Sequence, residues 1–304
     1  TGGQNTALGR QALKANTTAS NNTAVGYQAA YSNTSDNISA FGWKALYGNT
    51  SGEYNIALGN QALLSNTTGT KNTASGYQAL VSNTTASNNT AVGYQAGYSN
   101  TTGTSNTALG QGSLYSNSVG TDNTSIGQAT LYNNTASDNT ALGVSALNGN
   151  TTGTHNIGVG RRPLLSNTSG SYNVAMGTDA LRSNTTASNN TAVGYQAGYN
   201  NTTGTEISAV GYQAGINNTA SELTAFGSQS ARSNTTGIRN AAFGRAALYS
   251  NTTGASNTAL GNEALLANTT ASYNTAMGYQ AGYSNTTGTH QALVGYQAGR
   301  LATG

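Results

Sequence analysis

Apolar and polar positions recur along the chain with a period of 17. One Gly returns at a spacing of 17, except for three spacings of 16, which gives 18 copies of a single repeat. Counting from this column Gly, position −1 is apolar in 17 of 18 copies, position +3 is Ala in 14, and position +7 is Asn in 17. The first members of the Gly column are Gly9, Gly26, Gly42, Gly59, Gly76, Gly93 and Gly110. A fixed phase over this many copies predicts one continuous repeat array over residues 1–304.

The repeat length and its residue types predict strands rather than helices. Two packed helices need about 33 residues per repeat, twice what is present here. Around the column Gly, Thr, Val, Tyr and Ala alternate as in a strand, whereas the following N-T-T-G or N-T-T-A carries turn residues. We therefore predict an all-β fold, a parallel β-solenoid or β-roll of 18 coils that each span one period of about 17, with two short strands and two turns per coil.

The repeated small and polar residues suggest particular roles in such a coil. A Gly that recurs at one position of the repeat suits a backbone with positive φ. It also suits a place where the backbones of successive coils come so close that a Cβ would clash with the same position of the next coil. Ala at position +3 predicts a thin interior. Asn at position +7 suits either a ladder of side-chain amides along the stack or an ordinary turn, and both interpretations stay open. Members of this column include Asn16, Asn33, Asn66, Asn83 and Asn100.

The alternation of small and large apolar residues places them on opposite faces. Neighbouring residues of a strand point to opposite sides, so Ala at position −2 and the large residue at −1 cannot both face the inside. We expect Ala and Gly inside the coil and an apolar column outside it. Apolar residues on both faces indicate that both are covered, and the simplest arrangement is a symmetric homotrimer. The proposed inter-chain column contains Leu8, Val25, Phe41, Leu58, Val92 and Leu109.

Tyr residues show a correlation within the repeat. Wherever position +4 is Gly, position +1 is Tyr, as in the pair Tyr94 and Gly97. We interpret this as packing, with the ring filling the volume that Leu occupies in other copies, since aromatic residues at β spacing usually pack against one another. An aromatic ladder that binds sugars is the functional alternative.

The composition excludes several classes of protein and partner. The 40 Gly and many Asn, Thr and Ser residues would also suit a disordered linker, but a linker has no reason to keep an apolar column. Only 6% of residues are charged and the net charge is +3, so no basic surface for nucleic acid is expected. The absence of Cys excludes disulfides, and no apolar run is long enough to insert in a membrane.

Residues that could carry catalysis or hold a metal are few and scattered. The two histidines, His155 and His290, stand eight copies apart, so they cannot share a metal ion. They occupy position −5, which in other copies holds charged residues and is therefore interpreted as an exposed rim. No carboxylate pair recurs at a local spacing suited to acid and base catalysis. We expect no cofactor, no metal and no enzymatic activity, and we interpret Arg161-Arg162-Pro163 as an exposed irregularity, with a partner contact as the alternative.

The motif N-T-A-V-G-Y-Q-A, seen at Asn89–Ala96 and Asn190–Ala197, resembles the head repeats of trimeric autotransporter adhesins, the YadA-like heads. The longer repeat also resembles those of phage tail fibres and bacterial surface fibres that end in an endosialidase-type chaperone. The resemblance implies a left-handed, trimeric β-roll on an extracellular or cell-surface fibre. It also implies adhesion to a host surface, a glycan or the extracellular matrix. The period of 17 is longer than in the adhesin heads, and we expect the chain to be a segment of a longer fibre.

Two further functions remain open from the sequence. Ice or mineral binding would use Thr17, Thr34, Thr50 and Thr67, which a flat coil would array at about 4.8 Å along the stack. An amyloid-like secreted matrix subunit would use the same parallel pairing between chains. The structural and adhesive fibre segment is the interpretation that the repeat favours.

Overall fold

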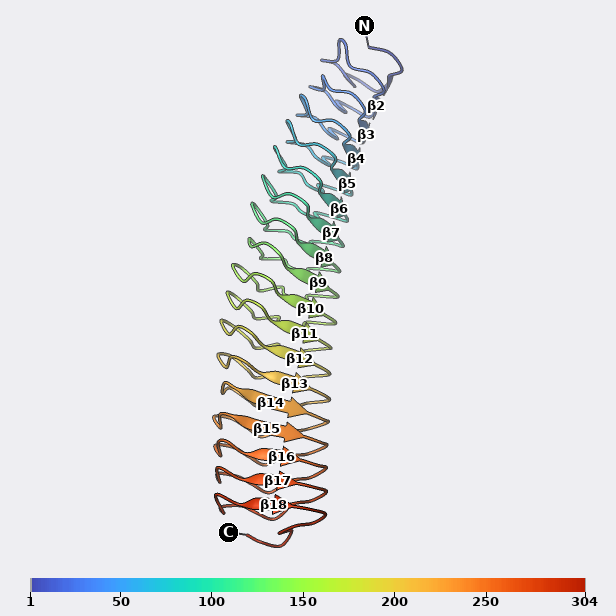
Figure 1. Ribbon diagram of the computed structural model, residues 1–304. Helices are drawn as coiled ribbons and strands as arrows, with labels where there is room; N and C mark the ends of the chain where they lie inside the picture. Colours follow the sequence, from blue (N-terminus) through green and yellow to red (C-terminus); the bar gives the residue numbers. More distant parts are fainter. Residues whose placement is uncertain (1, 304) are drawn as a thin grey trace. The chain divides into compact units, whose positions relative to one another are not determined.

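The computed structural model describes residues 2–303 and consists of short parallel strands joined by turns (Figure 1). No helix occurs among these described residues. Within them, eighteen strands follow one another, one per copy of the repeat, which confirms the predicted all-β parallel solenoid and its period. The chain divides into two units, Thr1–Thr154 and His155–Gly304.

The described part of the first unit stacks nine strands in register. Residues at one position of the repeat pair with the same position of the next copy, for example Ala91 with Ala108 and Val92 with Leu109. The strands are β1 (Thr6–Leu8), β2 (Thr23–Val25), β3 (Ser39–Phe41), β4 (Ile56–Leu58), β5 (Thr73–Ser75), β6 (Thr90–Val92), β7 (Thr107–Leu109), β8 (Thr124–Ile126) and β9 (Thr140–Leu142).

The second unit, over its described residues 155–303, repeats this arrangement with nine more strands. These are again parallel and in register, as in the pairing of Ala192 with Ala209. Two of them, β14 and β15, are one residue longer than the others. The strands are β10 (Ile157–Val159), β11 (Val174–Met176), β12 (Thr191–Val193), β13 (Ser208–Val210), β14 (Leu223–Phe226), β15 (Asn240–Phe243), β16 (Thr258–Leu260), β17 (Thr275–Met277) and β18 (Ala292–Val294).

Each coil has one strand where the sequence predicted two. The remainder of the coil contains left-handed backbone at positions −5, +2 and +4, illustrated by Asn88 (φ 61°), Gln95 (φ 53°) and Gly97 (φ 60°). A strand cannot continue through such residues because their backbone is not extended. These segments are nevertheless held coil to coil by backbone hydrogen bonds, such as the amide of Gln95 donating to the carbonyl of Tyr77 at 2.9 Å.

The column Gly ends each strand in a conformation that other residues rarely adopt. Gly93 has a φ of 137°, and a Cβ built on it would lie 2.6 Å from the carbonyl oxygen of Gly110 in the next coil. Both reasons expected for Gly, a positive φ and the close approach of two backbones, therefore apply at this position. The same geometry holds at the other column residues from Gly9 to Gly76.

The interior is wider than the sequence suggested. Ala at positions −2 and +3 is fully buried, as expected, for example Ala57 and Ala62. Leu at position +4, for example Leu46 and Leu63, is also fully buried and lies inside the coil. The expectation that only Ala and Gly fill the interior was wrong, because the left-handed residues at positions +2 and +4 turn the Leu side chain inward.

The Tyr beside Gly at position +4 packs against a neighbouring Tyr, as expected, but the idea that its ring fills the volume of a Leu was wrong. A Cβ on Gly97 would lie 2.9 Å from a methyl carbon of Leu80 in the preceding coil, so that Leu fills the space. The ring of Tyr94 is instead 50% exposed and stacks on Tyr77, with centroids 5.4 Å apart. Gly at +4 therefore makes room for a neighbouring Leu and leaves the Tyr at the surface.

Candidate functional site

The outer face of the strands carries the apolar column at position −1. Phe41, Leu58 and Val92 are each 40% exposed and Leu8 is 67% exposed, whereas Val25 and Leu109 are half-buried. The alternate residues at position −2, such as Ala40, Ala57 and Ala91, are buried. The column therefore forms an exposed apolar stripe along the strands within the first unit, and its members stand in register.

The predicted Asn column forms a buried ladder inside the coils. Asn66 donates to the side-chain oxygen of Asn49 at 2.7 Å, Asn83 to that of Asn66 at 2.7 Å, and Asn100 to that of Asn83 at 3.0 Å. The same amides donate to the carbonyl three residues ahead, as from Asn66 to Gly69 at 3.0 Å. The two interpretations left open by the sequence therefore both apply, since each Asn serves in the ladder and in its own turn.

The short copies of the repeat, where the spacing falls to 16, interrupt this ladder. The missing residue falls just after the Asn at position +7, and the amides of Asn33, Asn134 and Asn218 donate instead to the carbonyl two residues ahead. Asn16, in the coil before the first short turn, bonds within its own turn to Ala19. The missing residue thus removes the ladder bond to the preceding coil, and the ladder begins again in the next coil while the strands stay paired.

A second Asn ladder was missed in the sequence. At position −4, the side-chain oxygen of Asn72 accepts the backbone amide of Asn89 at 3.0 Å, and the Asn89 side chain donates to the carbonyl of Gly103 at 2.9 Å. Its signal was available, because Asn occupies this position in 14 of 18 copies. The side chains at position −4 therefore connect the residue before each strand to the turn on the opposite side of the coil by hydrogen bonds.

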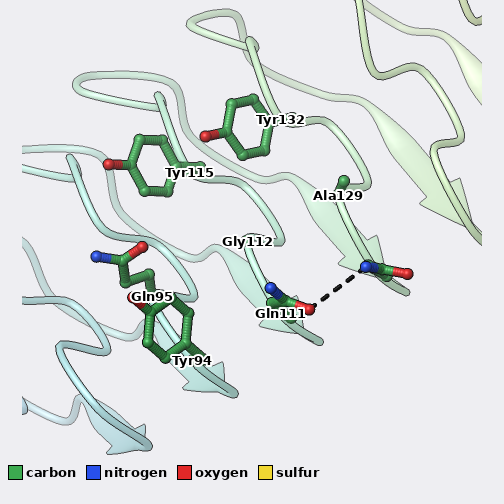
Figure 2. Close-up of a pocket in the computed structure, with 8 residues that line it drawn as sticks. Tyr94, Gln95, Gln111, Gly112, Tyr115, Ala129 and Tyr132 are labelled. Atoms are coloured by element: carbon green, nitrogen blue, oxygen red, sulfur yellow. Dashed lines mark hydrogen bonds between the residues drawn. The ribbon is translucent and has the colours of Figure 1, made fainter.

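A hollow of about 130 Å³ opens on the surface of the first unit, between β6 and the coils of β7 and β8 (Figure 2). Position +2 holds Gln in the coils just before it but Gly112 and Ala129 here, which form the floor. The aromatic column at position +5 forms one wall. The residues around the hollow are Tyr94, Gln95, Gln111, Gly112, Tyr115, Gln128, Ala129 and Tyr132.

The aromatic wall is a continuous stack. Tyr98 and Tyr115 have ring centroids 4.9 Å apart and are inclined by 6°, and Tyr115 and Tyr132 are 4.8 Å apart and inclined by 2°. Burial raises the pKa of the Tyr115 hydroxyl above its ordinary value, and the neighbouring Tyr132, Tyr98 and Tyr94 add to the rise. The Tyr115 hydroxyl is therefore neutral near pH 7 and can both donate and accept a hydrogen bond.

The histidines lie on an exposed rim, as the sequence predicted. His155 stacks on Tyr172 with centroids 4.8 Å apart, and His290 on Tyr273 at 4.9 Å. Among the described residues no group of three His, Cys, Asp or Glu side chains could hold a metal ion.

The Arg161-Arg162-Pro163 segment is only partly exposed. Arg161 faces solvent, but Arg162 pairs with the buried Asp179, with 3.0 Å between nitrogen and oxygen, and Pro163 is buried. Arg182 lies 3.6 Å from the other oxygen of Asp179. The interpretation as an exposed irregularity was therefore wrong, because the second Arg of the segment belongs to an ion-pair cluster.

Three of the four Thr residues that could have bound ice use their hydroxyl hydrogens within the chain. Thr34, Thr50 and Thr67 each donate to the carbonyl oxygen of a Thr in the next coil, at 2.8, 3.0 and 3.0 Å. The N-x-T sequons of the same turns begin with buried Asn, and Asn66 is fully buried with its amide bonded. The folded chain therefore presents neither these Thr hydroxyls as donors nor Asn66 as a glycosylation acceptor.

No family model matches the sequence, and no curated protein was found to match it. Within the part of the chain that the structure describes, no helix is long and apolar enough to cross a membrane.

Proposed function

We propose that the chain is a non-enzymatic structural and adhesive segment of an extracellular or cell-surface fibre and assembles as a homotrimer. The observation that carries this proposal is the exposed apolar stripe at position −1, because soluble monomers rarely leave a long contiguous apolar surface in water. An identical chain presents the same side chains at the same spacing, so copies of the chain match one another in register. The resemblance of the repeat to trimeric adhesin heads supports the same arrangement.

The geometry suits a fibre because stability comes from contacts between successive coils. Strands, Gly column and Asn ladder all bond to the neighbouring copy, so length is gained by adding copies without changing the contacts of the others. The outer residues at positions −5, +1 and +5 vary between copies, which lets one framework carry different surfaces.

Multi-angle light scattering at micromolar concentration tests the association. The unaltered chain should have the mass of three chains. A variant with Leu58→Ser, Val92→Ser and Leu109→Ser should dissociate to monomers, and the strands should persist because Ser75 already occupies this column in β5. The matched control is Tyr54→Ser on the rim, where Ser105 stands in another copy.

A monomeric mass for the unaltered chain would contradict the proposed trimer. So would a triple variant that keeps the mass of the unaltered chain. Circular dichroism of each variant checks that the β structure is retained.

A further inference from the structure

We propose that the hollow lined by Tyr94, Gln95, Gln111, Tyr115, Gln128 and Tyr132 is a binding subsite for one uncharged sugar ring of a glycan. This inference deepens the adhesive role proposed above and rests on it for its biological meaning. The binding itself belongs to the first unit alone and can be measured directly.

The hollow results from missing side chains and not from a distorted backbone. Gly112 and Ala129 have φ of 61° and 51°, close to the 53° of Gln95 at the same position of the preceding coil. Their amides bond to the preceding coil at 2.9 Å, as the amide of Gln95 does. The framework therefore continues unchanged while two successive Gln side chains are absent, which leaves a preformed space.

The Gln ladder ends at the edge of this space with an unused acceptor. Gln78 donates to Gln61 at 2.8 Å, and Gln95 donates to Gln78 at 2.9 Å. The next residue of the column is Gly112, so no side chain of the described residues donates to the Gln95 side-chain oxygen. A ligand hydroxyl in the hollow can take the place of the missing Gln amide.

The opposite side of the hollow adds further amide groups. Gln128 donates to Gln111 at 3.3 Å, the bond drawn in Figure 2, which leaves the Gln111 amide hydrogens and the Gln128 oxygen for other partners. The amides thus supply both donors and acceptors around a small space. A sugar hydroxyl is donor and acceptor at once and matches this mixture.

Aromatic surface is available beside these amides. One face of Tyr94 stacks on Tyr77, but position +1 of the next coil is Gln111, so the other face has no aromatic partner. Tyr115 and Tyr132 stack beside the hollow, and an edge of the Tyr132 ring lies 3.2 Å from where a Cβ of Gly112 would be. An apolar C–H face of a sugar ring can lie against Tyr94 while its hydroxyls reach the amides.

Charge and size restrict the class of ligand. No Lys, Arg, Asp or Glu is among the described residues that line the hollow, so nothing there offsets the desolvation of a charged sugar or a phosphate. The volume of about 130 Å³ is well below the roughly 300–1,000 Å³ of sites that enclose a drug-sized ligand. One neutral ring of a longer glycan, with the rest of the glycan in solvent, fits these limits.

Saturation-transfer difference NMR on the full chain tests the subsite, with the methyl glycosides of galactose, glucose, mannose and N-acetylglucosamine as probes and glucuronic acid as the charged comparison. We expect at least one neutral glycoside to bind at millimolar concentration, and to bind more tightly than glucuronic acid. Failure of all four neutral glycosides to bind, or preference for the charged sugar, would overturn the proposal.

Gly112→Gln fills the hollow with the side chain that position +2 carries in the preceding coils. Because the new Cβ would lie 3.2 Å from the ring of Tyr132, that ring must shift by a small distance. The substitution should weaken glycoside binding at least tenfold and leave thermal unfolding within a few degrees of the unaltered chain. Lys44→Gln, which introduces the same side chain at position +2 four coils earlier, should bind glycosides as the unaltered chain does. Unchanged binding by Gly112→Gln would place the sugar elsewhere and refute the assignment.

Light scattering on the same samples separates this inference from the proposed function. Glycoside binding by a monomeric chain would refute the trimer and leave the subsite standing. A trimer without glycoside binding would refute the subsite and leave the fibre role standing.

Discussion

The inner and outer columns of the coil tolerate change very differently. Inside, Asn occupies position +7 in 17 of 18 copies, and those from Asn33 to Asn285 are buried. Outside, position +2 is filled by a Gln ladder ending at Gln95 and left empty at Gly112, and in the second unit it holds the partly exposed Arg162, which pairs with the buried carboxylate of Asp179. The left-handed backbone at position +2 is the same in all three cases.

The difference follows from access to water. A buried amide that loses its partner keeps its desolvation cost, whereas a half-exposed one can exchange its partner for water. The coil therefore separates a fixed framework from a surface on which groups can be added or removed, and three substitutions test that separation.

Gly93→Val should have the largest effect, because it acts on the framework. Valine at a φ of 137° is strained, and its Cβ would overlap the backbone of Gly110. We expect the free energy of unfolding to fall by about 3–5 kcal/mol, measured by denaturant titration. Ser99→Asn on the surface of the same coil is the control, since Asn200 holds that position in an otherwise identical segment. Unchanged stability of Gly93→Val would remove the role given to the Gly column.

Asn83→Ala should come next. It removes the bonds of Asn83 to Asn66 and to the carbonyl of Ala86, and the bond accepted from Asn100. We expect a loss of about 2–3 kcal/mol and faster amide hydrogen exchange in the adjoining coils. Asn60→Ala, at an exposed position of the same unit, should change stability by less than about 0.5 kcal/mol. Equal effects of the two variants would show that the ladder adds nothing to stability.

Asp179→Asn should have the smallest effect, because its partners Arg162 and Arg182 remain about 30% exposed. We expect a loss of about 1 kcal/mol that shrinks in high salt, measured by thermal unfolding at two ionic strengths. Glu222→Gln, which breaks the exposed pair with Arg239, should cost less than half as much. A loss above that of Asn83→Ala would contradict the division into inner and outer columns.

The strand and its two faces could be predicted from the sequence because alternation is a local property. Ala at −2 and the apolar residue at −1, such as Ala91 and Val92, have opposite exposures as expected. The inward direction of Leu63 could not be predicted, since alternation of faces holds only in extended backbone, which a φ of 58° at Gln61 ends. No pattern of residue types pointed to a left-handed Gln.

The hollow could not be predicted because it depends on side chains that are absent. Its sequence signal is the replacement of Gln by Gly112 and Ala129 in two successive copies, which has meaning only once position +2 is known to form a surface ladder. The stacking of Tyr115 on Tyr132 follows from register, which the sequence did predict. The candidate site thus combines a predictable spacing with an unpredictable gap in a side-chain column.

The buried Asn bonds of the position +7 ladder run in one direction, from the amide of a later coil to the oxygen of the coil before it, as from Asn100 to Asn83. Their dipoles therefore add along the stack and polarise one another. The short turns at Asn33, Asn134 and Asn218 restart this alignment, and the buried oxygen of Asn117 is left without a partner before one of them. Each unit consequently contains separate runs of aligned amide dipoles. The length of each run is set by the positions of the 16-residue spacings.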